Sequence, residues 1–303
     1  MRTGEDLAFV GVSMHFIKGV LAITFMTLNA ATVWVPLAIW IVQSTWTRGE
    51  KLRLLKRRMD NIILWWAGNN RRMFQALKIS DVQVTWEGQE QMSDQAWYLV
   101  VANHQSWTDI VILQSHLYGV IPPLKFFTKE TLIWVPFIGV AMKVLGFPYV
   151  KRATKAQIKA NPELRNADRD NTLAACAGFQ NHPTCVLNFV EGTRRTAEKQ
   201  ARQSGEFAHL LRPKIGGLGY VIEGMEGFIE ELVDVTIVYP DGVPTFWAYL
   251  QGRCPRVIVH VQAHSIPQAL RTGSDVERKS ALGQWINALW RDKDARIGQV
   301  LEA

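Results

Sequence analysis

Hydrophobic and polar positions divide the chain into two unlike parts. From residue 19 to residue 47 the sequence contains no Lys, Arg, Asp or Glu. An uncharged apolar run of this length is long enough to span a bilayer or to lie within one leaflet. Asn29 and Pro36 fall inside the run, so a bent, re-entrant helix is an alternative to a simple span. The pattern therefore predicts a membrane-anchoring helix near the N-terminus.

A second helix is predicted directly after this run. Apolar residues recur with helical spacing over residues 52–77, at Leu52, Leu55, Met59, Ile62, Ile63, Trp66, Met73 and Leu77. Six basic residues stand at its start: Arg48, Lys51, Arg53, Lys56, Arg57 and Arg58. Such a block favours the cytoplasmic side of a membrane and attracts anionic lipid. We expect an interfacial helix; a core helix of a soluble domain is the alternative. Residues 1–80 are thus assigned to the anchor.

Residues 81–303 have the pattern of a separate folded domain. Apolar runs predict strands at residues 82–86, 97–102, 124–128, 147–150, 184–190, 234–239 and 256–262. Helical patterns occupy residues 165–179 and 275–301, with one or two short helices in 131–145, and the polar residues 195–211 read as a loop over the site. Strands separated by helices indicate an α/β fold, with a mainly parallel sheet flanked by helices and preceded by the anchor.

A polar turn follows the apolar run that ends at Ala102. His104 lies in this turn, and Asp109 comes five residues later, where a helix is expected to begin. Open α/β sheets bind their ligands at the carboxyl ends of strands. A hydrogen bond from the imidazole to Asp109 would select one tautomer and leave the other nitrogen as a base. Ser106 or Thr108 is the expected helix cap. Taken alone, a turn histidine near a solvated aspartate explains the spacing equally well.

A second polar turn, Glu191-Gly192-Thr193-Arg194, follows the apolar run of residues 185–190. Together and in this order, the two turns resemble the lysophospholipid acyltransferase family, of which the 1-acyl-glycerol-3-phosphate acyltransferases are members. That family carries Asn-His-x4-Asp followed by Glu-Gly-Thr-Arg, and both patterns are matched here. Residues 146–152 resemble the Gly-led block that lies between them, and residues 234–240 resemble the branch that includes lysocardiolipin acyltransferases. Val190 stands where the family often has a proline.

The resemblance implies an O-acyltransferase. It would move a fatty acyl chain from acyl-CoA or acyl carrier protein to the free hydroxyl of a lysophospholipid, with lysophosphatidic acid as the first candidate. The resemblance assigns catalysis to His104 and Asp109, and acceptor binding to Glu191, Gly192, Thr193 and Arg194. Arg194 has the forked geometry that suits a phosphate. Lys125, Lys129 and Arg152 are second candidates for phosphate or coenzyme A contacts.

The amino-acid composition and net charge indicate which classes of binding partner to expect. A formal net charge of +7, 48% hydrophobic residues and 12 Trp favour an anionic membrane and phosphorylated substrates over nucleic acid. The three cysteines have no metal-ligand spacing, so we expect no metal and no cofactor beyond the acyl donor. The expected location is a membrane, the bacterial inner membrane with the catalytic domain on the cytoplasmic side.

Several alternatives stay open. A remodelling acyltransferase or a transacylase would act on other lysophospholipids. A basic membrane-surface protein without catalysis is the alternative from another class. Ser106 suggests a serine hydrolase, although no Gly-x-Ser-x-Gly elbow surrounds it.

Overall fold

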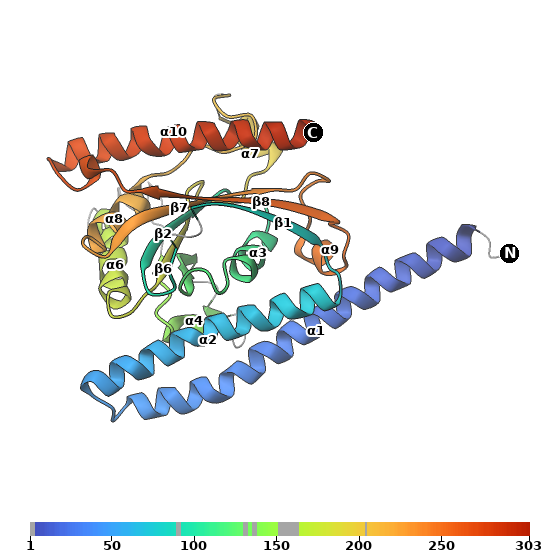
Figure 1. Ribbon diagram of the computed structural model, residues 1–303, viewed down its shortest axis with the longest axis horizontal. Helices are drawn as coiled ribbons and strands as arrows, with labels where there is room; N and C mark the ends of the chain where they lie inside the picture. Colours follow the sequence, from blue (N-terminus) through green and yellow to red (C-terminus); the bar gives the residue numbers. More distant parts are fainter. Residues whose placement is uncertain (1–3, 89–91, 130–132, 135–137, 151–163, 204) are drawn as a thin grey trace.

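A six-stranded sheet organises the computed structural model, which describes residues 4–88, 92–129, 133–134, 138–150, 164–203 and 205–303 (Figure 1). Its strands lie in the order β1-β8-β7-β2-β6-β3. They are β1 (Asp81–Glu87), β2 (Trp97–Ala102), β3 (Leu124–Phe126), β6 (Cys185–Phe189), β7 (Ile229–Val238) and β8 (Arg256–Ser265). Every neighbouring pair is parallel except β7 and β8. The predicted α/β class with a mainly parallel sheet is confirmed.

Helices cover both faces of this sheet. In Figure 1, α10 (Asp275–Glu302) crosses one face, while α3 (Thr108–His116) and α9 (Phe246–Leu250) lie on the other. Other helices in the described part of the domain are α4 (Ile138–Val144), α6 (Leu164–Phe179), α7 (Ala197–Ala201), α8 (Gly216–Gly224) and a 3₁₀ turn at Gln268–Leu270. The predicted helices at 165–179 and 275–301 are confirmed. The sequence did not predict α8 and α9, because one begins in a glycine-rich stretch and the other has only five residues.

One predicted strand divides into two. The run at residues 124–128 forms β3 in the main sheet and then β4 (Thr128–Lys129), which pairs with β5 (Tyr149–Val150) in a separate two-stranded sheet. The apolar run itself does not show that its first residues pair with β6 and its last residues with β5. That division depends on where residues 147–150 lie in the fold.

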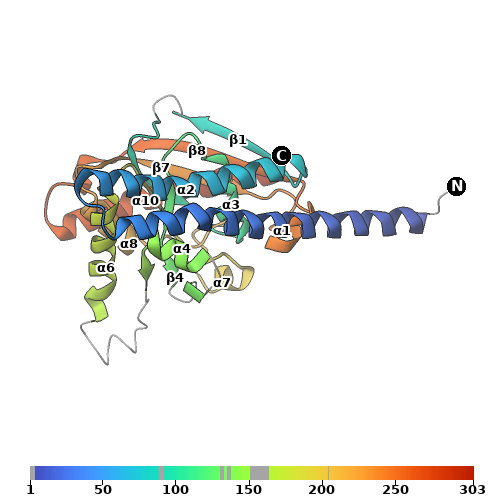
Figure 2. The same ribbon diagram turned by 90° about the horizontal axis from the view of Figure 1, so that it is seen from below.

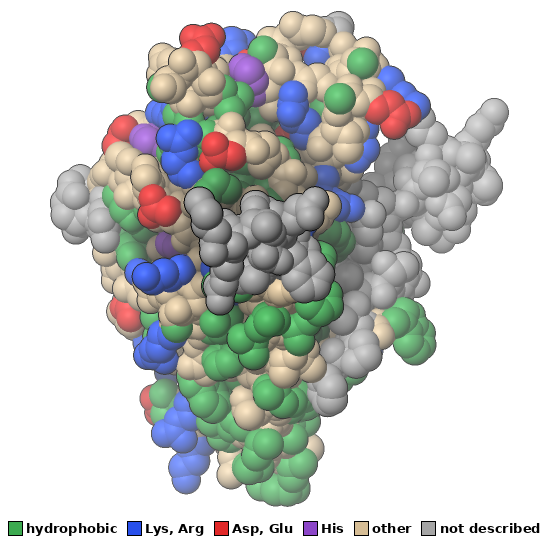
Figure 3. Space-filling view, turned by 90° about the vertical axis from the view of Figure 1, so that its right-hand side faces the viewer, with side chains coloured by type: hydrophobic (Ala, Val, Ile, Leu, Met, Phe, Trp, Pro, Cys, Tyr) green, Lys and Arg blue, Asp and Glu red, His purple; other side chains and the backbone are tan. Residues whose placement is uncertain are grey.

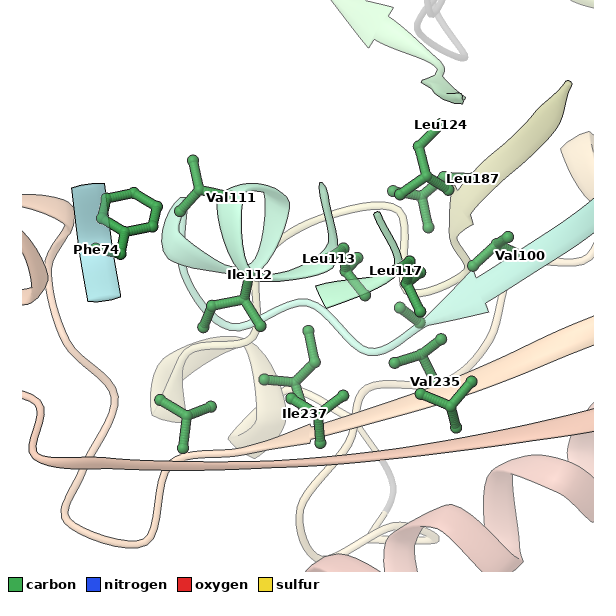
Figure 4. Packing of buried hydrophobic residues seen from close by; sticks show 14 of the residues in the cluster. Phe74, Val100, Val111, Ile112, Leu113, Leu117, Leu124, Leu187, Val235 and Ile237 are labelled. Carbon is green, nitrogen blue, oxygen red and sulfur yellow. The ribbon is translucent and has the colours of Figure 1, made fainter. Parts of the chain in front are cut away.

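Strand β2 is buried on both faces, which explains its unbroken apolar run. Leu99 and Val101 pack in the cluster beneath α10, which includes Trp290, whereas Val100 and Ala102 pack in the opposite cluster. In that second cluster, side chains of β2, β6 and β7 meet α3, and Phe74 reaches the same core (Figure 4). Burial from both sides holds the carboxyl end of β2 rigidly between its neighbours β6 and β7.

The N-terminal helices form an antiparallel hairpin against the domain (Figure 2). Helix α1 (Gly4–Ser44) is continuous through Asn29 and Pro36, and α2 (Gly49–Ala76) corresponds to the helix predicted at 52–77. Asn29 does not interrupt α1, because its side-chain amide donates to the carbonyl of Trp66 and to Asn70 Oδ1, both at 3.0 Å. Its polar atoms are thus satisfied within the hairpin.

Both halves of α1 contact the rest of the protein. Near its start, His15 Nδ1 lies 2.7 Å from the carbonyl of Gln251, and Phe16 packs edge-on against Trp247. Further along, Val33 and Leu37 are buried in a cluster with residues of α2 and α4. The hairpin and the domain therefore share packed cores. The division at residue 80 separates them in sequence and does not mark a loosely linked pair.

Most of the exposed large hydrophobic side chains among the described residues lie in the hairpin. Residues Ser13–Ser44 are long and apolar enough to cross a membrane, and 28% of the most apolar window is buried within the protein. Exposed apolar side chains of this segment include Phe16, Leu21, Leu28, Val35 and Ile39. Figure 3 shows apolar side chains concentrated on the lower part of the molecule, where the hairpin lies, with Lys and Arg side chains along one edge.

Candidate active site

His104 and Asp109 form the hydrogen-bonded pair that their spacing predicts. His104 follows β2, and its Nδ1 lies 2.8 Å from Asp109 Oδ2 in the first turn of α3. The His104 ring stacks on Phe189, with ring centroids 4.0 Å apart, and its side chain is 13% exposed. Because Nδ1–H donates to the carboxylate, Nε2 is the nitrogen left to accept a proton.

Asp109 is fully buried and accepts hydrogen bonds on both oxygens. Besides His104, the backbone N–H groups of Gln105 and Ser106 donate to Oδ2, at 2.6 and 2.9 Å. The hydroxyl of Tyr239 donates to Oδ1 at 2.5 Å. A buried carboxylate with this many donors is held in one orientation.

Neither Ser106 nor Thr108, the two predicted caps of the helix after His104, is its N-cap in the structure. Helix α3 begins at Thr108 with Trp107 as its N-cap, and no side chain caps it. Ser106 instead donates its hydroxyl to the carbonyl of Pro244 at 2.7 Å and accepts the N–H of Thr108 at 3.2 Å. Ser106 is 4% exposed and its hydroxyl bonds no histidine, so its surroundings do not resemble those of an activated nucleophile.

The second turn is joined to the first through the backbone of His104. Glu191 Oε1 accepts the His104 N–H at 2.8 Å, and the N–H of Arg195 donates to the His104 carbonyl at 2.8 Å. Gly192 has φ +69°, a conformation that other residues adopt only with strain. This positive φ explains why a glycine stands between the acid and the base in the turn.

Glu191 holds two loops together. It is fully buried, and its Oε2 accepts the Leu211 N–H at 3.0 Å. Burial raises its pKa to about 7, against the opposing effect of these two N–H donors. The resemblance assigned Glu191 to the acceptor. The geometry instead favours a structural role, since both carboxylate oxygens are already bonded to the backbone.

Thr193 and Arg194 lie at the open side of this turn. Arg194 is exposed, and its guanidinium lies 5.1 Å from the ring centre of Trp107. Lys199, on α7, donates to Thr193 Oγ1 at 2.7 Å and to the Arg194 carbonyl at 2.8 Å. The turn therefore gathers two positive charges close to the His104 loop, which suits an anionic group.

Lys125 lies apart from this turn. It is level with Leu99 in the sheet, two strands from β2 and five residues before His104 along the strand direction. Its ammonium is buried and pairs with Asp60 of α2 at 2.5 Å. This position favours a structural role over the expected phosphate contact. Arg152, like Lys151, lies outside the described residues, as does the side chain of Lys129.

Residues 195–203 and 205–211 do not form the open loop that their polarity suggested. They contain α7, and Asp294 of α10 accepts the N–H groups of Ala208 and His209 at 2.8 and 2.7 Å. The Trp290 indole donates to the Leu211 carbonyl at 3.0 Å. The polar side chains predicted a loop, but hydrogen bonds between the backbone of this segment and side chains of α10 hold it in place.

Two residues of the site were missed in the sequence. Tyr239 ends the apolar run of β7, just before Pro240, and Lys199 lies in a charged stretch. The run before Tyr239 was recognised as a strand, but only its position next to β2 shows that its end meets Asp109. Within the described segments, no group of three or more His, Cys, Asp or Glu side chains is placed to hold a metal ion.

An α/β sheet that presents a His–Asp pair beside an exposed arginine suits transfer of a group to a hydroxyl. The chain belongs to the Acyltransferase family, whose model matches residues 83–240, more than half of the chain. This confirms the family inferred from the two turns. The finer branch, that of lysocardiolipin acyltransferases, stays a prediction.

Two named acyltransferases are similar to this chain in sequence. The 1-acyl-sn-glycerol-3-phosphate acyltransferase epsilon of Mus musculus is 24% identical over 221 residues, covering 65% of this chain and 56% of the relative. The 2-acyl-1-lysophosphatidylinositol acyltransferase of Saccharomyces cerevisiae is also 24% identical, covering 65% and 59%. The chain thus spans less than two thirds of these relatives.

A solved structure shares the fold. The crystal structure of the 1-acyl-sn-glycerophosphate acyltransferase PlsC from Thermotoga maritima has a TM-score of 0.50 and 20% identity to this chain. The match covers 91% of this chain and 97% of the other, so it includes much of the N-terminal hairpin as well as the sheet.

Proposed function

We propose that this protein is a membrane-bound O-acyltransferase that esterifies the free hydroxyl of a lysophospholipid, with lysophosphatidic acid as the first candidate acceptor. The observation that carries the proposal is the His104–Asp109 pair at 2.8 Å, next to the exposed Arg194. Acyl-CoA or acyl carrier protein would supply the acyl chain. The proposed reaction needs no cofactor besides this thioester.

The reaction follows from the free nitrogen of His104. Nε2 takes the proton of the acceptor hydroxyl as its oxygen attacks the thioester carbonyl. The tetrahedral intermediate then collapses, the carbon–sulfur bond breaks, and the imidazolium returns the proton to the leaving sulfur. Asp109 stabilises the imidazolium while it exists. The products are an ester and a free thiol, and no acyl-enzyme is formed.

Arg194 is proposed to bind the acceptor phosphate. Its guanidinium is exposed, and its contact with Trp107 orients it beside the His104 loop. Thr193 adds a hydroxyl. An acceptor held here would have its headgroup fixed while its free hydroxyl reaches His104, which converts the attack into an effectively intramolecular step.

The hairpin is proposed to place the site at a membrane surface. An apolar cavity of about 130 Å³ lies between α1, α2 and α4, lined in part by Leu37, Ile62 and Met142. Because both halves of α1 contact the domain, these contacts favour a helix lying along one leaflet over the simple span. A location at the bacterial inner membrane, with the domain on the cytoplasmic side, is part of the proposal.

The test is thioester release from oleoyl-CoA by the purified protein, with and without lysophosphatidic acid. We expect release that requires the acceptor, with His104→Ala lowering kcat by about 100- to 10,000-fold because the general base is lost. His116→Ala, at the far end of α3, is the matched control and should keep activity.

Different outcomes lead to different conclusions. Substantial activity in His104→Ala would contradict the role given to this residue. Release that ignores the acceptor would indicate a hydrolase. Activity only with lysophosphatidylinositol, or only with acyl carrier protein, would keep the chemistry and change the substrate. The yeast relative's name makes the inositol lipid the second acceptor to test.

A further inference from the structure

Three neighbouring parallel strands deliver the groups that surround Asp109. The chain leaves β2 toward His104, leaves β6 toward Glu191, and leaves β7 at Tyr239. Tyr239 is 3% exposed, and its hydroxyl lies 2.5 Å from Asp109 Oδ1. Its residue type is not part of either turn motif, so nothing in the reaction described above requires it.

We infer that Tyr239 is a positioning residue for acyl transfer, which holds the Asp109 carboxylate in the orientation that aligns His104. This inference rests on the proposed function. The geometry supports it because the hydroxyl is on the carboxylate oxygen opposite the one that meets His104. Rotation of the carboxylate would therefore break the Tyr239 bond and the His104 bond together.

The direction of the Tyr239 hydrogen bond is determined by its surroundings. Burial, reinforced by the negative charge of Asp109, raises the pKa of Tyr239 well above its usual value. The phenol therefore keeps its proton at neutral pH and acts as a donor. Asp109, as an ionised carboxylate, acts as the acceptor, which makes this a charge-assisted hydrogen bond.

A second contact sets where Tyr239 lies. Asn103, immediately before His104, bonds the backbone of Ile237 twice: its amide donates to the carbonyl at 2.9 Å, and its carbonyl oxygen accepts the N–H at 2.8 Å. Ile237 is two residues before Tyr239, so the two side chains point to the same side of β7. The Asn103 clasp thus fixes β7 against β2 where Tyr239 must reach Asp109.

Removal of the hydroxyl should change the chemistry of the pair. With fewer donors, more of the Asp109 negative charge faces His104 and stabilises the imidazolium, so a higher pH should be needed to free Nε2 for catalysis. Other charges near the pair are Glu191 and Arg194 on the second turn and Lys293 on α10, which acts on Glu191. Because Glu191 has a pKa of about 7, its titration must be excluded as the cause of any change in the pH profile.

The experiment compares Tyr239→Phe with the wild type in the acyl-transfer assay. We expect kcat to fall about 10- to 100-fold, as for loss of a hydrogen bond to a charged group, while the acceptor KM changes little. The acid limb of the kcat/KM profile should move to higher pH, also in a Glu191→Gln background. Tyr249→Phe is the matched control, since Tyr249 is 1% exposed and packs on Phe74, and both its kcat and profile should be unchanged.

A second variant tests the inference without loss of the hydroxyl. With 3,5-difluorotyrosine at position 239, the phenol becomes a stronger donor, so the acid limb should move in the opposite direction, to lower pH. Wild-type kcat in Tyr239→Phe would overturn the inference, as would a loss of kcat with an unshifted pH profile in both variants. Failure of the wild type to transfer acyl groups would instead overturn the proposed function.

Discussion

At the residue scale, the site depends on carboxylates that are buried but well bonded. Asp109 and Glu191 are both fully buried, and each accepts backbone N–H groups of the His104 turn. Asp109 meets the imidazole, whereas Glu191 meets only the backbone among the described residues. The first carboxylate therefore orients the imidazole that we propose as the general base, and the second stabilises the turn that presents this imidazole.

Glu191 should make stability depend on pH. Its pKa is raised from 4.5 to about 7 in the folded protein, so between these values the folded state binds more protons than the unfolded chain. Stability from this group is present below pH 4.5 and is lost as pH rises through about 7, a change of about 3 kcal/mol. Glu191→Gln cannot titrate, so the wild type should lose stability relative to this variant between pH 5 and pH 8.

The measurement is the free energy of unfolding in detergent at both pH values. Glu226→Gln, at an exposed position, is the control and should track the wild type at both. A wild-type minus Glu191→Gln difference that stays constant from pH 5 to pH 8 would show that the carboxyl is not perturbed by burial.

At the scale of elements, one buried charge cluster joins the hairpin to the sheet. Asp60 of α2 pairs with Lys125 of β3 and with His182, which precedes β6. Lys125 also lies over the Phe179 ring, 5.2 Å from its centre. Breaking a buried pair leaves an uncompensated charge, which costs far more than loss of an exposed pair.

Asp60→Asn should therefore lower the free energy of unfolding by about 3–5 kcal/mol, because Lys125 remains buried without its carboxylate. Adding Lys125→Met should recover part of the loss. Glu50→Gln, which removes the exposed pair with Arg53, should change stability by less than about 1 kcal/mol. Urea unfolding in detergent measures the free energy of unfolding of the wild type, the two single variants and the double variant. A double variant no more stable than Asp60→Asn would mean that the pair does not couple α2 to β3.

At the scale of the whole molecule, the hairpin and the domain act as one body. The first half of α1 contacts α9, the second half contacts α2 and α4, and residues of both helices enter the central core. A helix held along its length by one domain cannot place its two ends on opposite sides of a bilayer without leaving those contacts. This is the physical reason to propose that the hairpin lies along one leaflet.

Cysteine labelling tests this arrangement. Met14 and Trp46 lie near the two ends of the apolar segment Ser13–Ser44, at 62% and 69% exposure, while the three native cysteines are buried. In sealed vesicles, Met14→Cys and Trp46→Cys should both react with an impermeant maleimide added from the same side. The wild type is the background control. Reaction of the two positions from opposite sides would establish a transmembrane span.

Local patterns were enough to predict the class of fold and the hydrogen bond between His104 and Asp109 in the candidate site. The unbroken apolar run of β2 specifies a buried strand, and the alternation of apolar and polar residues in β1 specifies a half-buried strand. The spacing of His104 and Asp109 closes a hydrogen bond within a single turn. Side-chain periodicity and short-range contacts are properties of a few consecutive residues, so the sequence contains them directly.

Contacts between distant segments could be decided only by the tertiary structure. Tyr239 lies 130 residues from Asp109, and Glu191 lies 87 residues from His104. The sheet order β7-β2-β6 brings these residues together. In the same sheet, Lys125 lies on the edge strand β3, where its ammonium pairs with the Asp60 carboxylate. Which side chain meets which carboxylate depends on strand order and register, because these determine the neighbours of each residue in space.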